Sequence, residues 1–190
     1  MLFLYIHGFN SSPASYKAKV FQKFLADRYP EHDFVCPELS DYPSEAITQL
    51  TQIIENNLPD IALIGSSLGG FYATFLAQKY HLKAVLVNPA VNPHILPNDF
   101  LGKTTNYYTG REYELTTEHI EQLKQLLVDK VSEPELFMVL LQSGDEVLDY
   151  RLAEQKYADT ELIIEQGGDH SFEGFENHCE SIVQFCTRDS

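Results

Sequence analysis

Residues 61–70, with the sequence IALIGSSLGG, constrain the fold of this chain more than any other segment. Four apolar residues, Ile61–Ile64, are typical of a buried strand, and a Gly-x-Ser-x-Gly turn follows them directly. Apolar residues then recur at helical spacing over Phe71–Leu76. The segment therefore predicts a strand, a sharp turn and a helix, with Ser67 at the turn.

The two outer glycines of this motif have a steric explanation. A serine hydroxyl held clear of the backbone at a strand end forces Ser67 into a strained φ/ψ region, and strand and helix then cross closely. We expect a Cβ at Gly65 or Gly69 to collide at that crossing. The helix is expected to begin near Leu68, with its N–H groups and the positive end of its dipole directed at the turn. Because the motif alone occurs by chance in roughly one chain in fifteen of this size, other residues must support it.

Predicted strands and helices alternate along the rest of the chain. This alternation predicts one α/β domain over residues 1–190, with a mostly parallel sheet of about six strands and helices on both faces. A helix is expected to start at the Ser12–Pro13 pair, which suits an N-cap and first helical position. Residues 90–116 are expected to be irregular. The six strands are expected near Leu2, Phe34, Ile61, Ala84, Leu136 and Leu162.

Composition and charge narrow the classes of partner. The chain of 190 residues has a net charge of −15, which argues against nucleic acid and anionic membranes as partners. Its three cysteines include no Cys-x-x-Cys pair, which favours a reducing compartment and no structural zinc. The apolar start, Met1–Ile6, is too short for a signal peptide or a membrane span. We therefore expect a cytoplasmic protein that uses no cofactor and no bound metal.

Five polar residues follow directly after predicted strands. Since the carboxyl ends of parallel strands share one edge of a sheet, these side chains should meet there. A serine hydroxyl needs a base to remove its proton, and the base needs an acid to fix its tautomer. The chain order Ser67, Asp145, His170 is the order of nucleophile, acid and base in folds with this turn. The five residues are His7, Ser67, Asn88, Asp145 and His170.

Neighbouring residues offer alternatives for two of these roles. Glu146 and Asp149 compete with Asp145 for the acid, and Asp145 is preferred because it leaves the strand first. Ser66 is the alternative nucleophile, but the flanking glycines lie two positions from Ser67 and not from Ser66.

Backbone donors and an acyl site can also be assigned. An oxyanion hole in this geometry uses the N–H after the nucleophile, from Leu68, and one from the loop after the first strand, for which Phe9 is the candidate. His7 is expected to brace that loop. Residues 91–127 lie where such folds carry a lid. Three tyrosines in this segment are candidates either to line an acyl pocket or to cover the core edge: Tyr107, Tyr108 and Tyr113.

Five stretches of the chain resemble the α/β-hydrolase superfamily, and more closely its small bacterial YqiA-like esterases. The stretches are YIHGFNSSP at 5–13, GSSLGG at 65–70, VNPA at 87–90, GDEVLDY at 144–150 and GGDH at 167–170. The resemblance implies a serine esterase of the bacterial cytoplasm that acts on small-molecule, short-chain acyl esters. It also implies that Ser67, Asp145 and His170 are the nucleophile, the acid and the base. Acyl-CoA thioesters are the alternative substrates, and a binding module without catalysis is the non-enzymatic alternative.

Overall fold

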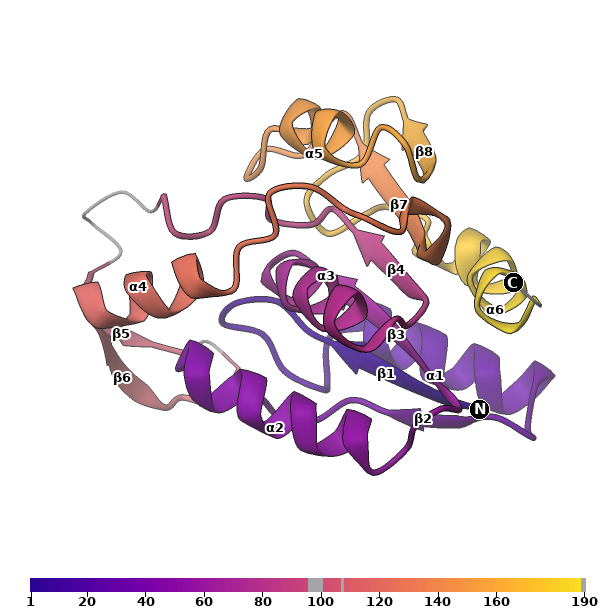
Figure 1. Cartoon of the computed structure of the whole chain (residues 1–190), viewed down its shortest axis with the longest axis horizontal. Coiled ribbons are helices and arrows are strands. Elements are labelled where there is room, and N and C mark those ends of the chain that lie inside the picture. Colours follow the sequence, from indigo (N-terminus) through magenta and orange to yellow (C-terminus); the bar gives the residue numbers. More distant parts are fainter. Residues whose placement is uncertain (96–100, 107, 189–190) are drawn as a thin grey trace.

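A six-stranded parallel sheet forms the centre of the protein (Figure 1). A computed structural model describes residues 1–95, 101–106 and 108–188. The strand order is β2-β1-β3-β4-β7-β8, and every neighbouring pair is parallel, which confirms the predicted sheet. The strands are β1 (Leu2–Ile6), β2 (Asp33–Val35), β3 (Ile61–Ser66), β4 (Ala84–Val87), β7 (Phe137–Gln142) and β8 (Glu161–Glu165).

Helices cover both faces of this sheet (Figure 1). Alternate residues of β1 show the division: Leu4 belongs to the core cluster that includes residues of α2, α3 and α5, and Phe3 belongs to the cluster that includes residues of α1 and α6. None of the helices within the described ranges is long and apolar enough to cross a membrane. The helices are α1 (Tyr16–Arg28), α2 (Pro43–Glu55), α3 (Leu68–Tyr80), α4 (Thr117–Gln125), α5 (Tyr150–Lys156) and α6 (Cys179–Thr187), with short 3-10 turns η2 (Pro134–Leu136) and η3 (Phe175–His178).

The first helix begins later than predicted. The Ser12–Pro13 pair precedes α1 and forms a turn instead of the helix start. Ser12 Oγ accepts the N–H of Ala14 (3.1 Å), and its carbonyl oxygen accepts the N–H of Ser15 (3.0 Å). Because Ser12 accepts both of these hydrogen bonds within the turn, α1 starts only after the turn, with Ser15 at the N-cap.

The prediction of an irregular segment at residues 90–116 is wrong. This segment contains an antiparallel pair of strands, β5 (Gly102–Thr105) and β6 (Glu112–Leu115). Along β6 the side chains of Tyr113 and Leu115 are buried and the two glutamates are exposed. This two-residue alternation is typical of a half-buried strand, but four residues are too few for it to stand out in the sequence.

The turn between β3 and α3 has the strained geometry that its glycines suggest. Ser67 has φ 55° and ψ −121°, a region that residues other than glycine rarely occupy. A Cβ at Gly69 would lie 2.0 Å from the carbonyl oxygen of Ile6, and one at Gly65 would lie 2.4 Å from the carbonyl oxygen of Gly69. Both glycines are therefore needed where α3 crosses β1 and β3.

Substitution of Gly69 by alanine is predicted to disrupt this crossing. The new Cβ would meet the backbone of β1, which cannot shift without loss of sheet hydrogen bonds. We therefore expect Gly69→Ala to lower the free energy of unfolding by about 3 kcal/mol, the upper end of the usual cost of overpacking, in urea titrations followed by circular dichroism. Gly110→Ala is the control, because Gly110 has φ +70° but no atom within 4 Å of an added Cβ. Gly110→Ala should lower the free energy of unfolding by only about 1–2 kcal/mol. Equal losses would contradict the steric explanation.

Candidate active site

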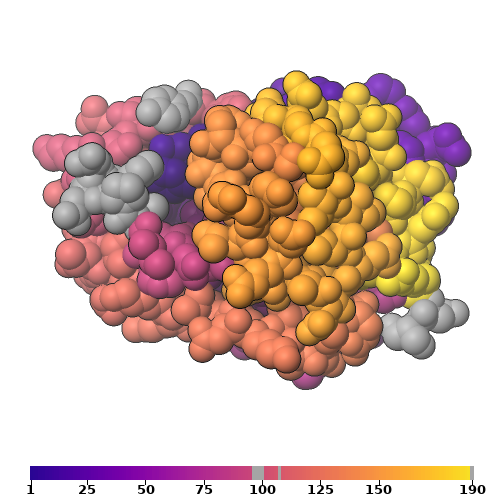
Figure 2. Space-filling model, turned by 90° about the horizontal axis from the view of Figure 1, so that it is seen from above, coloured from indigo at the N-terminus to yellow at the C-terminus, as the bar shows by residue number. Residues whose placement is uncertain are grey.

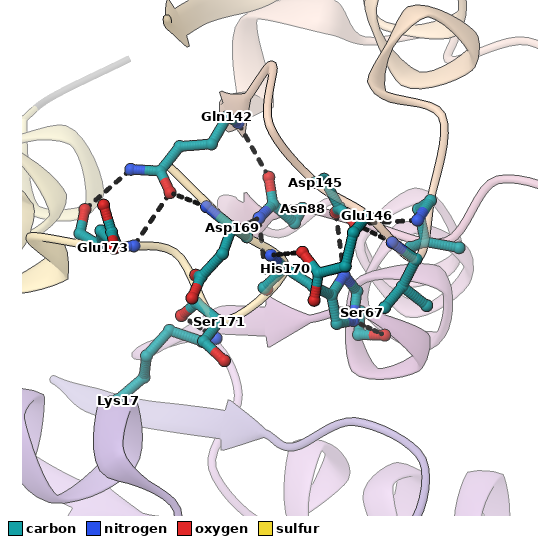
Figure 3. A network of polar contacts seen from close by, with 12 residues as sticks. Lys17, Ser67, Asn88, Gln142, Asp145, Glu146, Asp169, His170, Ser171 and Glu173 are labelled. Atoms are coloured by element: carbon teal, nitrogen blue, oxygen red, sulfur yellow. Dashed lines mark hydrogen bonds and ion pairs between the residues drawn. The ribbon is translucent and has the colours of Figure 1, made fainter. Parts of the chain in front are cut away.

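Ser67, His170 and Asp145 form a hydrogen-bonded row at the carboxyl edge of the sheet (Figure 3). His170 Nε2 lies 3.1 Å from Ser67 Oγ, and His170 Nδ1 lies 2.8 Å and 3.0 Å from the two carboxylate oxygens of Asp145. The Asp145 side chain is 2% exposed and the imidazole is 22% exposed. Since a carboxylate only accepts, Nδ1 carries the proton and Nε2 can accept one from the serine. The structure thus brings together the three residues to which the sequence assigns nucleophile, base and acid.

Asp145 is the carboxylate that faces the imidazole, and its two competitors have other partners. Glu146 accepts the backbone N–H of His170 at 3.0 Å. Asp149 caps α5 and binds the Arg151 guanidinium with two N–O distances of 2.8 Å. Glu146 therefore helps to hold the loop of the base, a contact that the sequence does not indicate.

Hydrogen bonds keep Asp145 ionised. Burial alone would raise the pKa of Asp145, but donation from His170 and from the N–H groups of Leu148 and Val147 lowers that pKa below its ordinary value. The two N–H groups lie 2.8 Å and 2.9 Å from the same carboxylate oxygen. They also fix the orientation of the carboxylate, and with it the orientation of the imidazole.

Two buried amide side chains hold the loop that carries His170 (Figure 3). Asn88 Nδ2 donates to the carbonyl oxygens of Asp169 (3.0 Å) and His170 (3.3 Å). Gln142 Oε1 accepts the N–H groups of Asp169 (3.1 Å) and Glu173 (2.9 Å). Asn88 is also tied to β7, because its Oδ1 accepts the backbone N–H of Gln142 at 3.0 Å. Buried amides with this many partners are rigid, so the loop takes its position from β4 and β7. Sequence reasoning missed Gln142, whose only signal is a polar residue that ends an apolar strand.

Two backbone N–H groups beside Ser67 are candidates for oxyanion donors. Leu68 is the first residue of α3, and Phe9 lies in the loop after β1. That loop is close to the serine, because a Cβ on Gly8 would lie 3.6 Å from Ser67 Oγ. Neither N–H donates a hydrogen bond within the part of the chain that the structure describes. Both groups are therefore available to an oxygen atom bound at the serine.

His7 braces this loop. The ring is 6% exposed, its Nε2 accepts the N–H of Leu39 at 3.3 Å, and its Nδ1 lies 3.0 Å from the carbonyl oxygen of Gly8. Burial lowers the pKa of His7, which favours the neutral ring that this donor and acceptor pair requires.

Two cavities meet at Ser67 and differ in chemistry. The larger has a volume of about 500 Å³ and is lined mainly by apolar side chains of α3, α4 and the segments that follow β4 and β7. Figure 2 shows the surface hollowed between the orange residues after β7 and the pink residues around β5 and β6. The smaller cavity, of about 190 Å³, is lined by more polar side chains, including that of His170. The serine hydroxyl thus has an apolar side and a polar side.

The three tyrosines considered for the acyl pocket have different positions. Tyr107 lies outside the described residues. Tyr108 is exposed and lines the smaller, polar cavity. Tyr113 lines neither of these two cavities; its ring is buried edge-on against Phe9, and its hydroxyl donates to Asn10 at 2.6 Å. The lining of the larger cavity is instead mostly aliphatic, and aliphatic residues on helices carry no signal that separates a pocket wall from the core.

Comparison with solved structures identifies the fold. Est1E from Butyrivibrio proteoclasticus, solved with ferulic acid bound, superposes with a TM-score of 0.75 and 16% sequence identity over 97% of this chain and 87% of that chain. Alpha/beta hydrolase domain-containing protein 10 from mouse superposes with a TM-score of 0.74 and 16% identity over 96% of this chain and 88% of that chain. These likenesses confirm the predicted α/β-hydrolase fold.

Comparison of sequences identifies the family. A UPF0227 protein from Citrobacter koseri is 22% identical over 98% of this chain and 99% of its own length. Residues 2–187 match the model of UPF0227, which is described as an uncharacterised protein family. This match confirms the resemblance to the small bacterial YqiA-like group. The chain is therefore a member of the UPF0227 family with an α/β-hydrolase fold.

Proposed function

We propose that this protein is a serine esterase that hydrolyses acyl esters through a covalent acyl-enzyme. The observation that carries the proposal is the row of Ser67, His170 and Asp145, with contacts of 3.1 Å and 2.8 Å, beside an apolar cavity. The fold supports the same reaction class, because its relatives include a protein named as an alpha/beta hydrolase and one that binds the aromatic acid ferulic acid. The proposed compartment is the bacterial cytoplasm.

In the acylation step, Ser67 Oγ attacks the carbonyl carbon of the ester while His170 Nε2 takes the serine proton. The negative charge that forms on the carbonyl oxygen is stabilised by the N–H groups of Leu68 and Phe9, near the positive end of the α3 dipole. The bond between the carbonyl carbon and the alcohol oxygen then breaks. His170 returns its proton to that oxygen, so the alcohol leaves neutral and the acyl group stays on Ser67.

Deacylation repeats these steps with water. His170 takes a proton from the water as its oxygen attacks the acyl carbon, and gives that proton to Ser67 Oγ when the acid departs. Asp145 stays ionised throughout and stabilises the imidazolium. The larger cavity is the proposed acyl site, because its aliphatic walls gain free energy when they exclude water from an apolar chain.

The acyl-CoA thioesterase alternative has less support. Among the described residues that line the two cavities, Lys17 is the only lysine or arginine. Coenzyme A carries several phosphate charges, which proteins usually bind with more than one cation. We therefore propose an oxygen ester, and a comparison of kcat/KM for butyryl-CoA and 4-nitrophenyl butyrate separates the two.

Removal of the serine hydroxyl is predicted to abolish hydrolysis. Ser67→Ala should lower kcat for 4-nitrophenyl butyrate by about 10⁴–10⁶-fold, because no acyl-enzyme can form. A fluorophosphonate probe should add its mass to Ser67 in the wild type, located by peptide fragmentation, and should not label the variant.

The matched control for this experiment is Ser132→Ala, which removes a serine on an exposed segment. Full activity of Ser67→Ala, or a label on Ser66, would refute the assignment of the nucleophile.

The acyl cavity predicts a dependence on chain length. Each buried methylene contributes about 0.8 kcal/mol, so kcat/KM for 4-nitrophenyl esters should rise about threefold to fourfold per added methylene until the chain fills the cavity. Ile120 lines this cavity from α4. Ile120→Trp should therefore move the optimum to a shorter chain, as kinetics over the acetyl-to-dodecanoyl series would show. The acetyl ester is the internal control and should keep its rate. An unchanged optimum in the variant would count against this cavity as the acyl site.

A further inference from the structure

The smaller cavity lies on the side of Ser67 from which the alcohol must leave. His170 lines this cavity and does not line the larger one. In the acylation step the proton on Nε2 goes to the alcohol oxygen, so that oxygen must lie next to the imidazole. The acyl group and the alcohol therefore have separate sites, with the aliphatic cavity for one and the polar cavity for the other.

A lysine reaches the polar cavity from α1. Lys17 Nζ donates to the carbonyl oxygen of Ser171 at 2.7 Å, beside the base (Figure 3). No carboxylate among the described residues lies within 4 Å of this ammonium in an ion pair. An ammonium has three N–H donors, and the described residues use one of them. The remaining donors are available to a ligand.

Two hydroxyl groups in the wall of the same cavity have no hydrogen-bond partner among the described residues. They are Tyr5 Oη and Ser15 Oγ, both shielded from solvent. Tyr5 is 1% exposed, and burial raises its pKa, so the phenol stays a neutral donor. Ser66 lies beside Tyr5 but outside normal hydrogen-bond geometry. Because these oxygens are shielded, they form part of the cavity wall, and the remaining N–H donors of Lys17 are the ones open to a ligand.

We propose that the polar cavity binds the alcohol part of the ester, and that this alcohol carries an anionic group, a carboxylate or a phosphate, which Lys17 holds. The inference rests on the proposed esterase function and adds the chemical class of its leaving group. The cavity has less than half the volume of the acyl cavity, about 190 Å³ against 500 Å³, so the alcohol is a short one. Lys17 thereby selects the substrate and takes no part in proton transfer.

The charge on Lys17 depends on its surroundings. Burial lowers the pKa of Lys17 to about 8, against the opposing effect of the Asp169 and Asp145 carboxylates. The imidazole rings of His7 and His170 also line the cavity, and burial lowers the pKa of His7. A lysine is charged below its pKa, so its selectivity for an anion should be greatest well below pH 8 and should decline as the pH rises through about 8.

The test uses two esters that differ in one charge. Butyryloxyacetate and its amide, butyryloxyacetamide, share the acyl group and the shape of the alcohol, and their hydrolysis can be followed by proton NMR. The wild type should show at least a tenfold higher kcat/KM for the carboxylate. Lys17→Met should lower the ratio of the two kcat/KM values at least tenfold, while Lys17→Arg keeps most of it. Because the ratio is compared between proteins, differences in the intrinsic reactivity of the two esters cancel.

Lys19→Met is the matched control, because it removes the same charge from an exposed position of α1 and should leave the ratio unchanged. A ratio in Lys17→Met equal to that of the wild type overturns the inference. So does an equal loss on both esters, which would assign Lys17 to support of the His170 loop.

A second measurement serves if Lys17→Met fails to fold. The ratio for the wild type, taken from pH 6 to 10, should fall above about pH 8 as the lysine is neutralised, and a constant ratio overturns the inference. If the wild type hydrolyses 4-nitrophenyl butyrate but shows no preference between butyryloxyacetate and butyryloxyacetamide, this inference alone is overturned. No hydrolysis of any ester would overturn the proposed function as well.

Discussion

The contact between Gly69 and the carbonyl oxygen of Ile6 is the constraint on which the rest of the site depends. Only a residue without a Cβ allows α3 to cross β1 so closely, and the crossing holds Ser67 at a positive φ. The same turn is tied to the next strand, because the N–H of Ser67 donates to Val87 (3.1 Å) and its carbonyl oxygen accepts the N–H of Ala90 (3.0 Å). The strain at the serine is thus maintained by hydrogen bonds on one side and by backbone packing on the other.

The crossing also explains why the two sides of the serine differ. With α3 against β1, the start of α3 and the loop after β1 both lie at Ser67, which brings the N–H groups of Leu68 and Phe9 to one place. The aliphatic cavity opens toward α4 and α5, whereas the polar cavity opens toward α1 and the loop of His170. Chemistry and selectivity can therefore be assigned to different elements of the fold.

Sequence reasoning succeeded where a residue's position along a strand determines its place in space. Ser67, Asp145 and His170 each follow a strand, and parallel strands bring their carboxyl ends to one edge whatever the details of packing. The sheet was predictable for the same reason, since long apolar runs alternate with amphipathic helices.

Features that depend on distant contacts could not be predicted in this way. The strands β5 and β6 are four residues each and, within the described ranges, pair with one another alone, so neither has a strong pattern of its own. Gln142 has partners 27 and 31 residues further along the chain, and nothing near it in sequence indicates them. Lys17 has the pattern of an ordinary lysine on an amphipathic helix, and its contact with Ser171 spans 154 residues. Tyr108 and Tyr113 illustrate the same limit, because the aromatic residues in a sequence do not indicate whether a ring lines a cavity or packs into the core.

The side-chain amides of Asn88 and Gln142 have a consequence for the loop that carries His170. The loop around His170 takes few of its hydrogen bonds from a helix or strand of its own, and its shape is instead held by side chains of β7 and of the residue that follows β4. Those side chains bind the loop through its peptide N–H and C=O groups and not through its side chains. The amide of Gln142 also excludes a side chain where the loop passes it, because a Cβ at Gly168 would lie 2.0 Å from Gln142 Oε1. The precision of proton transfer is thus inherited from the sheet interior through the backbone of the loop.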